Sequence, residues 1–480
     1  MIAPSGMSAP RIVHALFPEL LFSAHGFLSG RALLFEDDRI ALVDERQVVL
    51  EEVERRREQG QYVTSRQLPG KALVPGLVNT HSHAFQRGIR GRTEYPRAGG
   101  GEREDFWSWR GVMYRAADRL APEDVEALAL GLYVEMVKAG ITHVGEFHYL
   151  HHQPDGTPYE NPDELAHRTL RAARGAGLRL TMLRTYYARA GVGRPEPEGA
   201  QRRFCDPDLE FYLASLERLA AAGVPVGVTP HSIRAVPQDD LVRLVELARE
   251  RNWPLHMHIS EQPREVEECV EEYGCRPVEL MQRLGGLTPL TTLVHAIHLN
   301  AIEIEAIGDA GCSIASCPTT ERNLGDGVVP AHELRMAGAF FTFGTDSQCQ
   351  IAPLEDARQL EYHLRLQAQA RSLLFSDDRQ AGLELLAMLS ENGWRSLGGQ
   401  GGKLEVGQPS DFVAFDLNHL SLAGASQESL PLDLVFSASP EAVSDVWCQG
   451  VEVVNDRYHR AELQAAEDLA RVFRKLRSLD

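Results

Sequence analysis

Short apolar runs recur along the chain between residues 75 and 345, with amphipathic segments between them. The eight apolar runs are Leu77–His81, Ile141–His148, Leu178–Tyr187, Val224–His231, Pro254–Ile259, Thr291–Leu299, Cys312–Pro318 and Phe340–Thr345. The segments between them predict helices over Pro122–Ala139, Pro162–Ala176, Pro207–Ala222, Gln238–Arg251, Arg264–Tyr273 and Ala301–Ala310. Alternating strands and helices are typical of a parallel sheet, and eight such strands close a (β/α)8 barrel.

The two ends of the chain have a different pattern, in which apolar and polar residues alternate. Alternation predicts strands at Ala32–Phe35, Ile40–Val43, Gln47–Val53, Asp411–Leu417 and Leu434–Ala438, a solvated helix at Glu51–Gly60, a hairpin within Val443–Asp456 and a closing helix at Ala461–Leu476. We therefore expect an α/β protein with two parts. Residues 75–399 form the barrel, and residues 1–74 and 400–480 together form one small β-sandwich domain.

Composition and charge narrow the class of protein. The 480 residues are 43% hydrophobic and 24% charged, which is typical of a globular protein with a large core. A net charge of -19 argues against a nucleic-acid or anionic membrane surface. The chain has no C-x-x-C pair, no apolar stretch of about 18 residues and no signal-peptide pattern at its start. We expect a cytoplasmic protein with reduced thiols and no membrane span.

Side chains that can bind a metal lie at the ends of most predicted barrel strands. In strand order they are His81 and His83, Glu146 and His148, His231, His256 and His258, His295 and His298, and Asp346. His81 and His83 share one face because alternate residues of a strand point the same way. Each histidine alone is equally well explained as a hydrogen-bonded core residue. Their recurrence at the strand ends, which meet on one face of a barrel, favours a zinc or iron(II) site with a position open for water.

Two longer motifs bracket the barrel and carry a resemblance to a known family. KALVPGLVNTHSH precedes it and GKLEVGQPSDFVAFD follows it, and Asp346 lies in FGTDSQ. Together with the strand-end histidines, these motifs resemble the amidohydrolase superfamily of metal-dependent hydrolases. The resemblance implies one divalent metal ion, zinc before iron, held by His81, His83, His258 and Asp346.

A second metal bridged by a carboxylated lysine, as in binuclear members of the superfamily, is not expected. The only lysine between His83 and Asp346 is Lys138, which lies in a predicted helix far from a strand end. A bridge made by a glutamate or a cysteine remains open.

The spacing of His258 and Glu261 in HISE is similar to the deaminase branch of the superfamily. That resemblance implies that Glu261 moves a proton to the nitrogen that leaves as ammonia. His295 would polarise or orient the attacking water. Asp346 would be both a metal ligand and a proton acceptor. The three residues are therefore the catalytic candidates.

Five shorter motifs narrow the substrate. HSHAFQR, FWSWRGVMY, GEFHYLHH, PHSIRAV and HISEQPREVEEC resemble the formimidoylglutamate deiminases of histidine degradation. Their substrate, N-formimino-L-glutamate, is a small anionic amidine with two carboxylates, and arginine forks hold carboxylates well. Arg110, in the lid-like connection Gly88–Arg119, and Arg234 are the candidates for those carboxylates. Tyr149 is a further donor, and Gln86 would reach the formimino nitrogen.

Other interpretations stay open at this point. Arg110 could instead stack on Trp107 or Trp109 at the surface, and His231, His256 and His298 have core or supporting roles. A second candidate function is deamination of guanine or a related heterocycle, and a third is a non-catalytic scaffold. The resemblance also suggests a homodimer.

Overall fold

The computed structural model describes residues 12–94, 104–375 and 378–477. The expectation about a signal peptide rests partly on residues 1–11, and the connection Gly88–Arg119 includes residues 95–103. Both sets lie outside the described residues. Among the helices described, none has the length and apolar character that a membrane span needs.

Eight parallel strands form the barrel, at the positions that the apolar runs predict. They are β6 (Leu77–Ser82), β7 (Ile141–His148), β8 (Arg179–Tyr186), β9 (Thr229–Pro230), β10 (Leu255–Ile259), β11 (Thr291–His295), β12 (Ser313–Ser316) and β13 (Phe340–Phe343). They pair in order as two four-stranded sheets, β6 to β9 and β10 to β13. Parallel bridges Val228–Leu255 and Ser82–Asp346 join these sheets at both seams, so the barrel closes.

Helices surround the barrel in the expected alternation. They are α2 (Phe106–Ala117), α3 (Pro122–Lys138), α4 (Glu164–Ala176), α5 (Leu209–Ala221), α6 (Gln238–Arg251), α7 (Pro263–Tyr273), α8 (Pro277–Arg283), α9 (Ala301–Asp309), α10 (Pro318–Leu324), α11 (Ala331–Ala337), α12 (Pro353–Ala368), α13 (Asp378–Leu389) and α14 (Glu391–Ser396), with 3-10 turns η1 (Ala84–Ile89) and η2 (Gly199–Arg203). Gly177 and Asn252 end α4 and α6 in the left-handed conformation. All six predicted helices are present.

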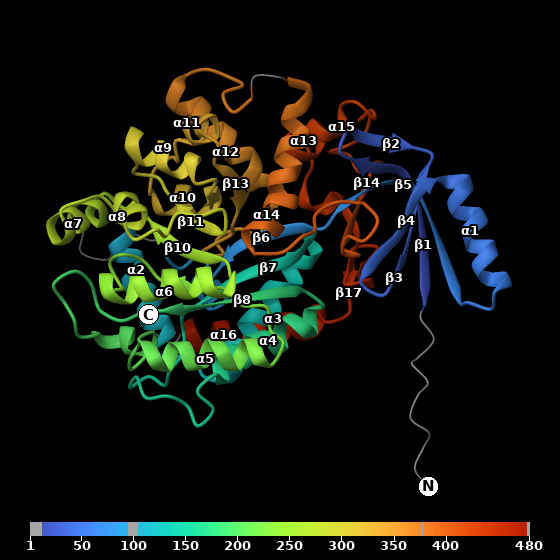
Figure 1. Cartoon of the computed structure of the whole chain (residues 1–480). Coiled ribbons are helices and arrows are strands. Elements are labelled where there is room, and N and C mark those ends of the chain that lie inside the picture. The colour runs from blue at the N-terminus through green and yellow to red at the C-terminus, as the bar shows by residue number, and fades with distance from the viewer. Residues whose placement is uncertain (1–11, 95–103, 376–377, 478–480) are drawn as a thin grey trace, which may run out of the picture.

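The two ends of the chain build one nine-stranded sheet beside the barrel (Figure 1). Its strands are β1 (Val13–Ser23), β2 (Gly26–Ser29), β3 (Arg31–Glu36), β4 (Arg39–Glu45), β5 (Val63–Pro75), β14 (Phe412–Asp416), β15 (Val443–Cys448), β16 (Val451–Asn455) and β17 (Tyr458–His459). The order is β17-β16-β15-β14-β5-β1-β3-β4, with β2 paired to β1. Phe35 of β3 and Phe412 of β14 are separated by two strands, yet their ring centroids are 5.2 Å apart. The sheet therefore curls into two layers, as the expected sandwich requires.

Three expected strands differ from the structure. Gln47–Val53 belongs to helix α1 (Arg46–Glu58), in which Val49 and Val53 are buried four positions apart. Leu434–Ala438 overlaps helix α15 (Leu430–Phe436), which has proline in its first turn and precedes the turn η3 (Pro440–Ala442). The run Val224–His231 yields only the two-residue β9, because its two prolines cannot donate to a strand ladder.

The closing helix α16 (Glu462–Arg477) packs against the barrel helix α3. Leu469 lies over Gly131, where a Cβ atom would come within 2.4 Å of the leucine Cδ1. Arg471 Nη1 donates to Asp124 Oδ1 at 2.8 Å. A side chain at position 131 would therefore have to displace Leu469. The division of the chain into residues 75–399 and the composite unit 1–74 with 400–480 stays our proposal.

Buried arginines hold the loops above the first three barrel strands. Arg184 of β8 donates two hydrogen bonds of 2.7 Å to Asp206, and both side chains are almost fully buried. Arg203 Nε donates to the carbonyl oxygen of His152 at 2.8 Å and Nη1 to that of Leu120 at 3.0 Å. These contacts tie the loops after β7 and β8 to the end of α2.

We predict that Arg184→Ala lowers the free energy of unfolding by about 3–5 kcal/mol, because it leaves the buried Asp206 carboxylate without its charged partner and, among the described residues, with only the His152 imidazole at 3.2 Å. Arg243→Ala is the control, since Arg243 pairs with Glu210 while both side chains are more than half exposed. We expect the control to unfold like the unmodified chain. The measurement is the denaturant midpoint of the three proteins. Equal midpoints for the two variants would refute the structural role of the Arg184–Asp206 pair.

Candidate active site

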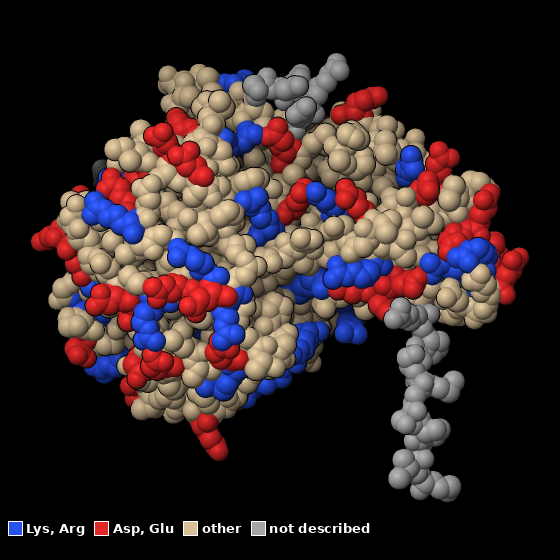
Figure 2. Space-filling view, viewed as in Figure 1, with Lys and Arg blue, Asp and Glu red and all other residues tan. Residues whose placement is uncertain are grey.

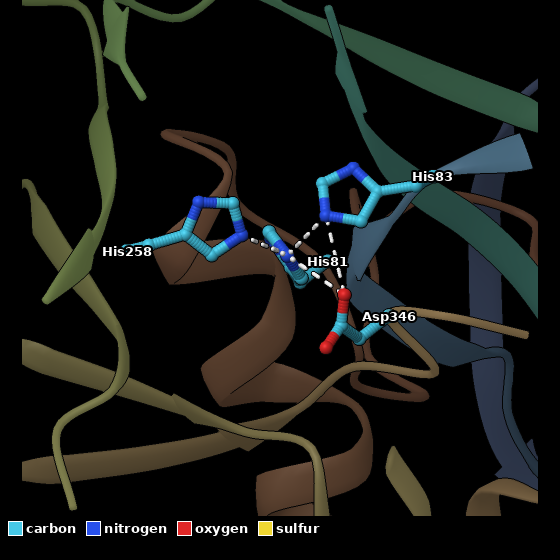
Figure 3. Close-up of side chains that lie close together, drawn as sticks. All are labelled: His81, His83, His258 and Asp346. Atoms are coloured by element: carbon cyan, nitrogen blue, oxygen red, sulfur yellow. Dashed lines mark hydrogen bonds and ion pairs between the residues drawn. The ribbon is translucent and has the colours of Figure 1, made fainter. Parts of the chain in front are cut away.

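Four buried side chains meet at the barrel seam formed by β6 and β13. His81 Nε2 lies 3.0 Å from both His83 Nε2 and His258 Nε2. Asp346 Oδ1 is 3.2 Å from His83 Nε2 and 3.5 Å from His81 Nε2. Figure 3 shows His81 at the centre of the group, with His258 on one side and His83 and Asp346 on the other. The structure thus brings all four predicted metal ligands together.

Neighbouring carbonyl groups orient two of these imidazoles. His83 Nδ1 lies 2.8 Å from the carbonyl oxygen of Phe147, and His258 Nδ1 lies 3.0 Å from that of His231. A carbonyl only accepts, so Nδ1 carries the proton and the lone pair of Nε2 points at the centre. Burial lowers the pKa of His81 to about 3 and that of His258 well below its usual range, which favours neutral imidazoles.

A divalent cation fits this arrangement. Lone pairs on neutral nitrogens repel one another at 3.0 Å unless a positive charge lies between them. Tetrahedral zinc with Zn–N bonds of 2.0–2.1 Å holds its ligand nitrogens about 3.3 Å apart. Three imidazoles and one carboxylate are a common donor set for zinc or iron(II). The chain therefore has a His-His-His-Asp cluster that could bind a metal.

Two further predicted catalytic residues adjoin the cluster. His295 Nε2 lies 3.6 Å from Asp346 Oδ2 and 3.7 Å from Glu261 Oε1, while its Nδ1 lies 3.3 Å from Glu321 Oε1. Burial alone would lower the pKa of His295, but the three carboxylates raise it to about 10. His295 can thus carry a proton between two carboxylates of the site.

Backbone strain is concentrated at the same strand ends. Ser260, His295 and Asp346 have φ angles of +51°, +70° and +48°, in the left-handed region that non-glycine residues seldom adopt. Such residues cost roughly 1–3 kcal/mol each and persist only where the surrounding structure holds them. Here the backbone amide of Asp346 donates to the carbonyl oxygen of His81 at 3.0 Å. The strain turns the chain so that the side chains point inward.

A cavity opens above the cluster, and the four predicted substrate-binding residues all line it. They are Gln86, Arg110, Tyr149 and Arg234, and they share the cavity with His83, His258, Glu261 and Asp346. Gln86 Nε2 donates to the Tyr149 hydroxyl at 2.6 Å. The buried Oε1 of Gln86 has no hydrogen-bond partner among the described residues, so it remains able to accept from a ligand.

The two predicted arginines differ in their surroundings. Arg234 Nη2 donates to Glu261 Oε2 at 3.1 Å, and its Nε lies 3.6 Å from Glu265 Oε2. Arg110 lies on helix α2 and not in a loop, which corrects the expectation for Gly88–Arg119. Its guanidinium stacks on Trp107 at 4.5 Å from the ring centroid and still lines the cavity. Arg110 can therefore stack on Trp107 and still present its guanidinium to the cavity.

Charge is distributed differently on the surface and in the cavity. Acidic and basic side chains are interspersed over the face of the molecule in Figure 2. The cavity gathers Arg110, Arg194 and Arg234 at one place, together with the carboxylates of Glu261, Glu268 and Asp346. A local cluster of arginines can hold an anion even though the whole chain is strongly acidic.

Several strand-end residues have roles that the sequence left undecided. Glu146 accepts from Ser82 Oγ and from the amide of Ala84, both at 2.6 Å, and so holds the turn after His83. Burial raises the pKa of Glu146 to about 7. His256 Nε2 lies 2.7 Å from the carbonyl oxygen of Ser396, away from the cluster.

Sequence reasoning gave no role to Tyr187 and Arg194 of the cavity wall, and it gave His231, which also lines the cavity, only a core or supporting role. Tyr187 and His231 end two of the predicted barrel runs, so their position was a signal for both. Arg194 follows β8 in a loop, where sequence offers no such signal.

Comparison with known proteins places this site in a family. The family model described as "Amidohydrolase family" matches residues 72–453. The chain belongs to the amidohydrolase family. It is 38% identical to a formimidoylglutamate deiminase of Pseudomonas aeruginosa over 413 residues, which are 85% of this chain and 90% of the relative. Family membership and this relative make the chain a hydrolase acting on C–N bonds.

Solved structures have the same architecture. An amidohydrolase from Brucella melitensis superposes with a TM-score of 0.85 at 34% identity, covering 98% of this chain and 100% of that one. An adenosine deaminase from Xanthomonas campestris with bound zinc superposes with a TM-score of 0.78 at 21% identity, covering 97% and 98%. At that lower identity the likeness establishes the fold alone.

We predict that His258→Asn lowers the metal content of the purified amidohydrolase to well below that of the unmodified chain, because it removes one converging nitrogen. His256→Asn is the matched control, since His256 is equally buried on the same strand but contacts Ser396. The measurement is metal per chain by elemental analysis after dialysis. Equal metal content in the two variants would exclude His258 as a ligand.

Proposed function

We propose that this amidohydrolase is a formimidoylglutamate deiminase, which hydrolyses N-formimino-L-glutamate to N-formyl-L-glutamate and ammonia in histidine degradation. The observation that carries the proposal is one cavity lined by Arg110, Arg234, Glu261 and part of the His-His-His-Asp cluster. The 38% identity to the Pseudomonas aeruginosa enzyme supports the same substrate. The cytoplasm as location and a homodimer as assembly belong to this proposal.

One divalent cation would be held by His81, His83, His258 and Asp346, and zinc is the first choice for its identity, with iron second. The donor set of three imidazoles and one carboxylate supports zinc. A cation bound there supplies Lewis acidity, which makes water a stronger nucleophile near neutral pH.

Three side chains then move the protons of the reaction. Water adds to the formimino carbon, and Asp346 accepts a proton from it. His295, whose Nε2 lies 3.6 Å from Asp346 Oδ2, orients the water. Glu261 delivers a proton to the formimino nitrogen, and the hydroxyl proton of the adduct follows through the same carboxylate, so the C–N bond breaks and ammonia leaves with both protons of the water. The proton on Asp346 then returns to Glu261 through His295, which lies between the two carboxylates. Arg234 Nη2 at 3.1 Å keeps the Glu261 carboxylate in place for this transfer.

Two arginines would bind the glutamate moiety of the substrate. Arg110 would bind one carboxylate of the glutamate moiety and Arg234 the other, with the Tyr149 hydroxyl as a further donor. Gln86 would accept from the formimino N–H through its unpartnered Oε1. Arg234 has a double task in this scheme, because it also pairs with Glu261.

A second candidate function is deamination of guanine or a related heterocycle. Trp107, Trp109 and Tyr187 line the cavity and offer faces on which a planar base could stack. The arginines favour the dicarboxylate, because a neutral base offers no anion to pair with them. A non-catalytic scaffold would have no need for a cavity that joins Glu261 to the ligand cluster.

The deciding assay for the substrate measures ammonia release from N-formimino-L-glutamate and, in separate samples, from guanine, adenosine and cytosine as alternative substrates. We expect release from N-formimino-L-glutamate alone. Metal per chain is determined on the same sample. Release from a heterocycle alone would replace the proposed substrate, and no release from a metal-loaded sample would reject both candidate functions.

We predict that Glu261→Gln lowers kcat by about 10²–10⁴-fold, because the amide cannot deliver the proton to the leaving nitrogen. Metal content should not change, since Glu261 is not among the four ligands. Glu268→Gln is the control, because Glu268 also borders the cavity but pairs with Arg264. Similar turnover in both variants would remove Glu261 from the mechanism.

Arg110→Gln should lower kcat/KM by roughly 10–100-fold, mainly through KM, because one substrate carboxylate loses a charged donor. Arg115→Gln on the same helix is the control, since Arg115 is exposed and lies outside the cavity lining. Steady-state kinetics on N-formimino-L-glutamate measures both. A change confined to kcat in Arg110→Gln would contradict a binding role.

A further inference from the structure

The seventh barrel strand also ends in a side chain that can bind a metal. Cys317 follows β12 directly, and its thiol is fully buried. A Cβ atom on Gly344 would lie 2.6 Å from His81 Cβ and 3.0 Å from Cys317 Sγ, so the thiol borders the ligand cluster. Ligand atoms of His295, Cys317 and Asp346 all lie within 4.8 Å of one another. The proposed mechanism leaves this thiol without a role.

The carboxylate of Asp346 faces two different sets of ligands. Its Oδ1 lies 3.2 Å from His83 Nε2 and 3.5 Å from His81 Nε2. Its Oδ2 lies 3.6 Å from His295 Nε2, and one oxygen of the same carboxylate lies within 4.8 Å of the ligand atoms of both His295 and Cys317. One carboxylate can therefore serve two cations at once, one through each oxygen.

The buried ring nitrogen of His295 points into this second group. His295 is fully buried, and its Nε2 has no hydrogen-bond partner within the described residues. Its Nδ1 is already directed to Glu321 Oε1 at 3.3 Å. The nearest acceptors of Nε2 are Asp346 Oδ2 at 3.6 Å and Glu261 Oε1 at 3.7 Å, both beyond hydrogen-bond distance. A cation between His295, Cys317 and Asp346 would take the place of the proton that these carboxylates attract to Nε2.

A purely structural role for Cys317 explains less. The thiol packs with Val294 and Ala315 and is a weak donor to the carbonyl oxygen of Ala315 at 3.8 Å. Packing accounts for its burial. It does not account for the convergence of the thiol, the His295 imidazole and the Asp346 carboxylate.

We propose that His295, Cys317 and Asp346 form a second, inhibitory site for a thiophilic divalent cation such as Zn²⁺, joined to the first site by the Asp346 carboxylate. Imidazole, thiolate and carboxylate together select zinc over magnesium or calcium, which prefer oxygen ligands only. Binding displaces the thiol proton of Cys317 and the Nε2 proton of His295 to solvent, because a coordinating thiol is deprotonated and a coordinating imidazole nitrogen must offer its lone pair.

Occupation of the second site stops turnover for a simple reason. The cation takes the two groups that orient the attacking water and accept its proton, His295 and Asp346. The inhibition rests on the proposed function, whereas binding of the second cation does not. Excess zinc should therefore inhibit, and the chain should hold a second metal equivalent while inhibited.

The test starts from the chain loaded with one equivalent of zinc and adds Co²⁺, which absorbs in the near ultraviolet when a thiolate binds it. We expect this thiolate-to-cobalt band in the unmodified chain and its loss in Cys317→Ala. Cys312→Ala is the matched control, because Cys312 is equally buried and directly precedes the same strand. The control should keep the band.

Activity at a second equivalent of zinc gives the other readout. We expect ammonia release to fall by about 100-fold or more in the unmodified chain, and to stay near its starting value in Cys317→Ala. Binding of only one equivalent by the unmodified chain, or an unchanged cobalt band in Cys317→Ala, would overturn the second site. Absence of ammonia release from every sample would instead reject the proposed function and leave the absorption result to decide the site.

Discussion

The structure depends on a buried cluster of lone pairs that the protein cannot satisfy with its own donors. Three imidazole nitrogens and a carboxylate converge within hydrogen-bonding distance, and carbonyl groups hold the protons of two of these rings on the far side. Such an arrangement is unfavourable without positive charge at its centre. The barrel, the strained strand ends and the buried arginines together hold the cluster in place.

The site and the closure of the barrel are formed by the same residues. The amide of His83 donates to the carbonyl oxygen of Asp346 at 3.2 Å, and the amide of Asp346 donates to that of His81 at 3.0 Å. The first and last strands are thus joined at the very residues whose side chains point to the centre. A displacement at this seam would move the site and the barrel together, which explains how the chain tolerates left-handed backbone there.

Much of this arrangement follows from the sequence, for reasons that also explain the failures. The barrel strands and their histidines were predictable because strand ends in a parallel barrel meet on one face. The strand expected at Gln47–Val53 is wrong because a short apolar run fits a helix and a strand equally well. The alternation of apolar and polar residues does not predict the path of a long connection between strands. Arg194 was therefore missed, and Arg110 was assigned to a loop although it lies on helix α2. Cys317 ends a predicted barrel strand, so its position could have marked it as a site residue. A cysteine at the end of an apolar run is, however, first interpreted as a core residue.

The seam between β6 and β13 has a consequence for how the chain folds. Asn79 and Thr345, which hydrogen-bond across it, are 266 positions apart in sequence. Contacts of such long range form late, because the chain must first lose the entropy of closing that loop. A chain still emerging from the ribosome carries His81 and His83 long before it carries Asp346. Capture of a metal by all four residues would therefore report that the chain has been made beyond Asp346 and that the seam has closed, since no earlier intermediate has the full set of ligands.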